Sequence, residues 1–195
     1  MGVRGVRASA GSGVVLAVLG VAYAVAAMTG WDPSWGAWFR AVLHLGELAV
    51  VMALAALLTN VGERGLLGRV GWAAAGIGQL LLAVAEVVYP AAPDLGDTLF
   101  GIGPLLSGLG MICVGIVVLR GRTLRWRVLP LIVGTWILVP VTPVLIATGG
   151  PPNPIALAAI ATWDVLWAAT AAAVLLSTST APVGVGVPVG GRATT

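Results

Sequence analysis

The sequence predicts an all-α membrane protein, with six transmembrane helices packed as an antiparallel bundle and joined by short loops. The first observation is composition: 59% of the 195 residues are hydrophobic and only 9% are charged, whereas a soluble domain has about 25% charged residues. The second is that apolar stretches of the length needed to cross a bilayer recur six times. Such a chain cannot cover a globule with polar surface, so we expect its solvent to be lipid.

The six predicted spans follow one another with short polar or Gly/Pro-rich segments between them. Their expected bounds are Val14–Met28, Ala37–Leu58, Val70–Tyr89, Leu99–Leu119, Val128–Ala147 and Ile155–Leu176. Residues 1–13 are rich in Gly and Ser, and the tail 177–195 cannot bury a core, so disorder is expected at both ends. Residues 14–176 then form a single transmembrane domain.

The arginines predict how the helices are inserted. All ten basic residues are arginines, and nine of them fall on one side of the predicted bundle: Arg4, Arg7, Arg64, Arg69, Arg120, Arg122, Arg125, Arg127 and Arg192. Asp32, Asp94 and Asp97 fall on the other side. By the positive-inside rule the arginine side is cytoplasmic, so both termini are expected in the cytoplasm of a cell-membrane protein. Alternatively, the first span is a cleaved signal peptide, since AYAVA resembles a cleavage site.

Two spans carry marked backbone features. Pro140 and Pro143, in the VPVTPV segment of the fifth span, are expected to kink that helix or unwind its outer end. The fourth span is rich in small residues, which favour close helix packing, with a hinge as the alternative. These are Gly101, Gly103, Ser107, Gly108, Gly110 and Gly115.

The stretch RAVLHLGELAV in the second span places three polar groups on one helical face. Arg40, His44 and Glu47 are spaced i, i+4, i+7, so they fall within a stripe about 60° wide. In the third span, Gln79 and Glu86 also share a face. The bland interpretation is that Glu47 pairs with Arg40 or His44 to fix helix register, while Glu86 reaches the outer interface.

Asp164 lies about ten residues into the sixth predicted span, between Trp163 and Trp167. No arginine is near it in sequence. Its structural alternative is a hydrogen bond to a hydroxyl such as that of Thr162 or Thr135. An ionisable group at a helix centre costs roughly 2.5–3.5 kcal/mol. Because the intramembrane acids come from three helices at similar depth, we expect them to share a polar cavity open toward the outside.

Several chemistries are disfavoured. One histidine rules out bis-histidine haem and multi-histidine iron sites, and the sequence contains no HExxH, CxxC or phosphate-binding glycine loop. No cofactor or metal is predicted, although His44, Glu47, Glu86 and Asp164 offer a weak set of ligands for a hard or borderline metal. Because the arginines lie at segment ends and form no patch, no nucleic-acid partner is expected.

The order WFRAVLH, GERGLLGR, GPLLSGLG and LRGR resembles the six-helix core of rhomboid intramembrane proteases. That resemblance implies Ser107 as the nucleophile. The chain departs from the family in having LLSG in place of GxSG and Asp164 where the family has its histidine base, and without a base the serine is not activated. More broadly, the chain resembles six-span membrane proteins of GC-rich bacteria, which implies no particular function.

Three functions fit these residues. The first is a membrane-embedded enzyme that acts on a lipid or isoprenoid by acid catalysis, as a cyclase or isomerase does. Its candidate catalytic groups are Asp164, Glu47, His44 and Glu86, and its candidate substrate-binding groups are Trp163, Trp167, Arg40 and Gln79. The second is a small proton-coupled transporter. The third is a non-catalytic assembly subunit. Expected partners are membrane lipids and a hydrophobic small molecule, with a homo-oligomer left open.

Overall fold

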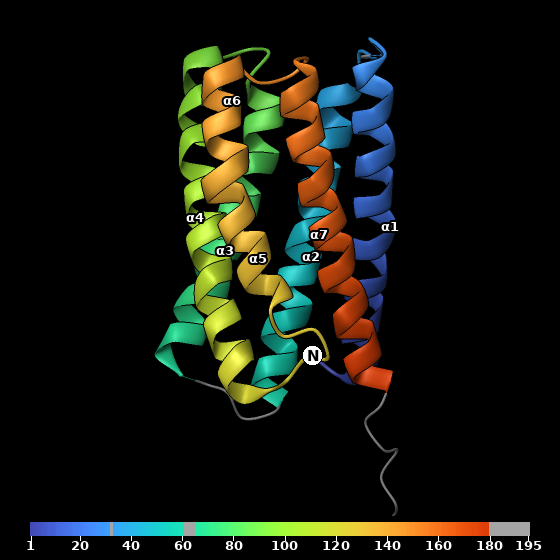
Figure 1. Cartoon of the computed structure of the whole chain (residues 1–195), viewed down its shortest axis with the longest axis vertical. Helices are drawn as coiled ribbons and strands as arrows, with labels where there is room; N and C mark the ends of the chain where they lie inside the picture. The colour runs from blue at the N-terminus through green and yellow to red at the C-terminus, as the bar shows by residue number, and fades with distance from the viewer. Residues whose placement is uncertain (32, 61–64, 180–195) are drawn as a thin grey trace, which may run out of the picture.

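A computed structural model describes residues 1–31, 33–60 and 65–179, and within these ranges the chain is helical and has no strand (Figure 1). Six helices of the described chain are long and apolar enough to cross a membrane. They are α1 (Val3–Met28), α2 (Gly36–Asn60), α3 (Leu66–Val88), α4 (Pro93–Gly121), the fifth span formed by α5 (Leu129–Trp136), η1 (Ile137–Val141) and α6 (Thr142–Thr148), and α7 (Pro154–Ser179). The predicted six-helix class is confirmed. The predictions for Asp32, Arg64 and residues 180–195, which include Arg192, lie outside the described residues.

The first helix begins much earlier than composition predicted. α1 starts at Val3, so the expectation of disorder over residues 3–13 is wrong. The reason is tertiary: Val6 and Ala10 are fully buried, and the Arg7 guanidinium donates a 2.9 Å hydrogen bond to the carbonyl of Thr178 in α7. At the other end, α7 continues to Ser179, so the first three residues of the predicted tail are helical as well.

The helices run along the long axis of the molecule, and each one packs against its neighbours in sequence (Figure 1). The most extensive contacts join α3 to α4, and α1 to α7, so the first and last helices close the bundle. Further contacts join α2 to α7 across its middle. This arrangement brings the polar faces of α2, α3 and α7 toward a common interior.

Glycines explain the tight packing of α4. A Cβ added at Gly110 would lie 2.6 Å from the carbonyl oxygen of Gly71 in α3, and one at Gly115 would lie 2.7 Å from Cα of Leu131 in α5. Gly101 is the exception among the small residues of the predicted set, with no atom within 4 Å of the added Cβ. The prediction that small residues on this helix serve close packing is therefore confirmed for Gly103, Gly108, Gly110 and Gly115, where an added Cβ would collide with a neighbouring helix.

The fifth span contains a π turn at the predicted proline segment. Pro140 lies inside η1, and the Thr142 hydroxyl donates a 2.7 Å hydrogen bond to the carbonyl of Ile137, five residues earlier. Proline lacks the N–H that continues an α-helix, and a wider turn accommodates this loss. The helix thus changes its winding without ending, and Ile137 and Leu138 pack against Gly108 of α4.

Candidate functional site

Near the start of α2 and the end of α3, the polar interior of the bundle contains an ion pair between these two helices. Arg40 donates from Nε to Glu86 Oε2 at 2.7 Å, and its Nη1 donates to the Tyr23 hydroxyl of α1 at 2.8 Å. The Tyr23 ring also contacts Phe39, with ring centroids 5.3 Å apart. Arg40 therefore connects α1, α2 and α3. Glu86 is paired with Arg40 and largely buried, whereas the sequence offered an exposed position at the membrane interface as its alternative.

Deeper in α2, His44 and Glu47 form a second pair. His44 Nδ1 and Glu47 Oε2 are 2.9 Å apart, and the Glu47 side chain is only 4% exposed. His44 is also close enough to Gln79 of α3 to interact with it. Gln79 in turn donates from Nε2 to the Ser107 hydroxyl of α4 at 2.9 Å. Polar contacts thus run from α2 through α3 to α4.

Asp164 differs from these groups because, within the described residues, no donor bonds to its carboxyl group. It is 5% exposed and faces Gly20 of α1, where an added Cβ would lie 2.7 Å from Asp164 Oδ2. The expected structural partners are occupied elsewhere. Thr162 donates to the carbonyl of Ala158, and Thr135 to that of Leu131, each at 2.9 Å within its own helix. The hydroxyl-bonded alternative for Asp164 is therefore wrong.

Asp164 is nevertheless connected to the other polar groups. It lies close enough to Glu47 for the two carboxyl groups to interact electrostatically. Next to it, the Trp163 ring lies 6.2 Å from the His44 ring and 6.1 Å from the Trp167 ring, measured between centroids. Hence α2 and α7 meet through two carboxyl groups, one imidazole and two indoles.

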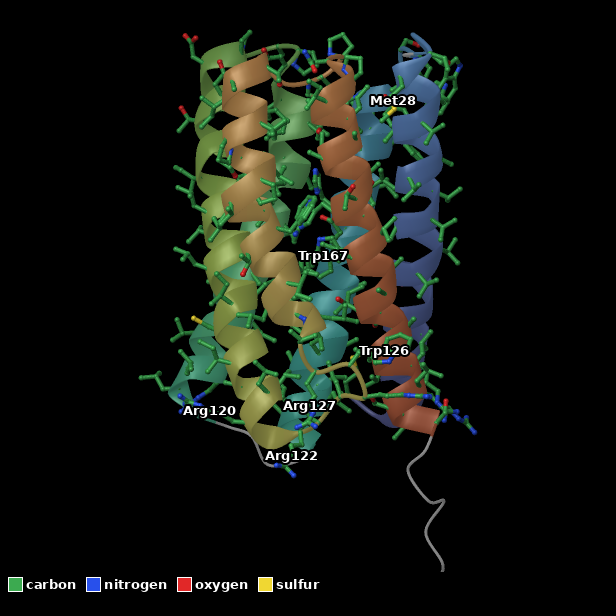
Figure 2. The ribbon with its side chains drawn as sticks, viewed as in Figure 1. Met28, Arg120, Arg122, Trp126, Arg127 and Trp167 are labelled. Carbon is green, nitrogen blue, oxygen red and sulfur yellow. The ribbon has the colours of Figure 1, made fainter. Side chains whose placement is uncertain are left out.

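Three buried polar atoms in this region have no hydrogen-bond partner in the described structure. They are the indole Nε1 donors of Trp163 and Trp167 and the amide Oε1 acceptor of Gln79. Buried polar groups are nearly always satisfied in folded proteins. Trp167 is completely buried and lies midway along the bundle, as Figure 2 shows. The site therefore offers donors and an acceptor that a bound molecule or water would satisfy.

We call these residues the intramembrane polar cluster: Tyr23, Arg40, His44, Glu47, Gln79, Glu86, Ser107, Trp163, Asp164 and Trp167. Its deepest carboxyl groups lie at matching depth, since Glu47 is eleven residues into α2 and Asp164 ten into α7, about 15 Å along each helix. Beyond them the buried side chains are mostly apolar, including Val50, Leu54, Leu58 and Val174, and the hydroxyl of the buried Thr170 bonds within its own helix. The cluster thus occupies one half of the bundle.

The structure brings all the predicted site residues into this cluster. The four ionisable groups predicted on α2 and α3 are paired as Arg40 with Glu86 and His44 with Glu47. The outward-facing cavity between them stays a prediction. Among the described residues, no group of three or more His, Cys, Asp or Glu side chains is arranged to hold a metal ion, so the weak metal alternative gains no support.

Tyr23 of the cluster, and Gly20 that faces Asp164, were not predicted from the sequence, and the role of Ser107 was misjudged. Tyr23 and Gly20 lie on α1, which was assigned no polar role, although Tyr23 is the only phenol in its span. Ser107 was linked to a rhomboid nucleophile. In the structure its hydroxyl accepts a bond from Gln79 and is 1% exposed. That arrangement supplies no base to activate it, so the rhomboid resemblance gains no support from the site.

The chain matches no family model, no curated protein and no solved structure. The class of this protein is therefore inferred from its own helices and their contacts. Six apolar helices of membrane-spanning length, with charged residues paired inside the bundle, are consistent with a multi-pass membrane protein.

Proposed function

We propose that this chain is a cell-membrane enzyme that acts on an apolar lipid or isoprenoid by acid catalysis, with Asp164 as its acid. The observation that carries the proposal is the position of Asp164: buried, without a hydrogen-bond donor among the described residues, and next to a second carboxyl group. An ionised carboxylate in that setting would be costly. The neutral acid is the form that the surroundings favour, and a neutral acid can donate a proton.

The proposal includes an antiparallel bundle with both termini in the cytoplasm. Arg120, Arg122 and Arg127 lie at the end of the molecule opposite Met28 (Figure 2). α4 begins near Asp94 and ends near Arg120, so its two ends differ in charge. By the positive-inside rule the arginine end faces the cytoplasm, and the polar cluster then lies in the outer half of the membrane.

The chemistry is an isomerisation or cyclisation. Asp164 donates its proton to a carbon–carbon double bond of the substrate, which becomes a carbocation. The indole faces of Trp163 and Trp167 stabilise that positive charge. Glu47 then accepts a proton from a neighbouring carbon, and a new double bond forms there. The product is an isomer of the substrate, and His44, bonded to Glu47, helps return the proton.

The experiment is a conversion assay with Asp164→Asn. Purified protein is incubated in liposomes with lipids extracted from cells that carry the gene, and the compounds are separated by chromatography and weighed by mass spectrometry. Because isomers have equal mass, the expected signal is a compound whose retention changes while its mass does not. Asp164→Asn should abolish the conversion.

Thr162→Val is the matched control, because Thr162 is exposed, lies two residues away and bonds only within its own helix. It should convert the compound as the parent does. Equal conversion by Asp164→Asn and the parent, with both folded, would remove Asp164 as the acid.

A second candidate, a proton-coupled transporter, is favoured by the π turn of the fifth span. η1 packs against Gly108, which is next to Ser107, the residue whose hydroxyl accepts a bond from Gln79. A change in the winding of η1 would therefore move Ser107 and alter its contact with Gln79 in the polar cluster. Liposomes that contain a pH indicator distinguish the two functions. A transporter acidifies or alkalinises the lumen when its solute is added, whereas an isomerase does not.

A further inference from the structure

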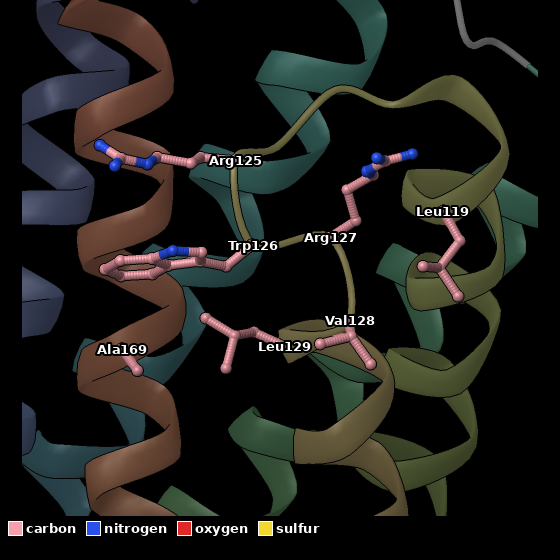
Figure 3. Close-up of a pocket in the computed structure, with 7 residues that line it drawn as sticks. All are labelled: Leu119, Arg125, Trp126, Arg127, Val128, Leu129 and Ala169. Carbon is pink, nitrogen blue, oxygen red and sulfur yellow. The ribbon is translucent and has the colours of Figure 1, made fainter.

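A crevice of about 530 Å³ lies at the arginine-bearing end of the bundle (Figure 3). It is formed where α4 ends, α5 begins and α7 passes beside them. Its apolar side is lined by Leu119, Val128, Leu129 and Ala169. The loop between α4 and α5 contributes the remaining lining residues, which are two arginines and a tryptophan.

The charged side of the crevice consists of Arg125 and Arg127, with Trp126 between them in sequence. Figure 3 shows Arg125 and the Trp126 ring extending over α7, while Arg127 extends toward α4. All three side chains are exposed, and among the described residues no carboxylate pairs with either guanidinium. Two guanidinium groups with no carboxylate partner in the described part of the chain therefore border an apolar surface.

We propose that this crevice binds an anionic glycerophospholipid. Guanidinium groups bind phosphate oxygens through paired hydrogen bonds, and basic crevices between transmembrane helices attract anionic headgroups. The exposed apolar residues beneath them, Val128 at 46% and Leu119 at 37%, match an acyl chain. Tryptophan is enriched at the level of lipid headgroups, where Trp126 would lie.

The apolar lining argues for a lipid over a soluble phosphate. A free anion would use the two guanidiniums and leave the aliphatic wall exposed, whereas a phospholipid covers both parts. The two guanidinium groups would thus bind the anionic headgroup, and the apolar wall would contact the acyl chain attached to it. That wall consists of Leu119, Val128, Leu129 and Ala169. This proposal does not depend on the enzyme proposed above.

Native mass spectrometry of the delipidated protein tests the proposal. Phosphatidylglycerol and phosphatidylcholine with identical acyl chains are titrated, with glycerol 3-phosphate as the soluble probe. Each arginine near a lipid surface contributes about 1 kcal/mol, so Arg125→Gln with Arg127→Gln should weaken phosphatidylglycerol binding about 30-fold. The control is Arg120→Gln with Arg122→Gln, which removes the same charge from the same end but does not line the crevice. It should bind nearly as the parent does.

A second variant keeps the test decisive if the arginine variant folds poorly. Ala169→Phe fills the apolar side and leaves both arginines in place, so phosphatidylglycerol binding should also fall. Equal binding of phosphatidylcholine would overturn the proposal, as would equal loss in the two arginine pairs. Tight binding of glycerol 3-phosphate that Ala169→Phe leaves intact would overturn it in favour of a soluble anion.

Discussion

The interface between α3 and α4 gives the most quantitative prediction, because its helices touch through glycine. In Gly110→Ala, the new Cβ would lie 2.6 Å from the Gly71 carbonyl oxygen and closer still to the backbone nitrogen of Ala75, whereas ordinary contact begins at 3.4 Å, so the two backbones must separate by more than about 0.8 Å. Overpacking of this kind costs typically 1–3 kcal/mol. The same movement would stretch the 2.9 Å bond from Gln79 to Ser107, and an interhelical bond in a membrane is worth about 0.6 kcal/mol.

We therefore expect Gly110→Ala to lower the free energy of unfolding by about 2 kcal/mol. The assay is reversible unfolding in mixed micelles, followed by circular dichroism. Gly101→Ala, on the same helix, is the matched control, since its Cβ meets open space and Ala favours the helix. It should leave stability unchanged or slightly raised. Equal stability of the two variants would refute the reasoning that backbone contact at glycine holds these helices together.

Three further predictions follow from the fold and the cluster. Arg40→Gln and Glu86→Gln should each destabilise the protein, and the double variant should lose less than the sum of the two; additive losses in a double-mutant cycle would show that the pair is not coupled. A reporter that is active only outside the cytoplasm, fused after residue 195, should be inactive, and activity there would reverse the proposed orientation. Thr142→Val removes the hydroxyl's bond to the Ile137 carbonyl and keeps the backbone N–H bond to the same oxygen, so it should cost about 1 kcal/mol in the same unfolding assay; a silent variant would show that the hydroxyl's bond does not support the π turn.

The helices and their polar contents could be predicted because the bilayer imposes a simple rule. A span needs an apolar run of fixed length, and polar groups inside it must find partners. These rules placed the six spans and indicated that Arg40, Glu47 and Asp164 belong together. They also identified the prolines of the fifth span as a break in regular winding.

The particular partners could not be predicted, because pairing across helices depends on rotation and depth. Arg40 shares a helical face with Glu47, yet it reaches across to Glu86. The other pair, Glu47 with His44, lies within α2 and was one of the two alternatives that the sequence offered for Glu47. The helical state of residues 3–13 was missed for a related reason. This segment is stabilised by packing on α7, where Arg7 donates a hydrogen bond to the Thr178 carbonyl. The composition of the segment does not indicate that contact.

The proposed acid chemistry requires that Asp164 hold a proton at neutral pH. Infrared spectroscopy of the protein in lipid detects the carbonyl stretch of a protonated carboxyl group separately from that of a carboxylate. We expect such a band at neutral pH in the parent protein, its disappearance in Asp164→Asn with the fold retained, and its persistence in Glu86→Gln. A spectrum of the parent protein with only ionised carboxylates at neutral pH would contradict it.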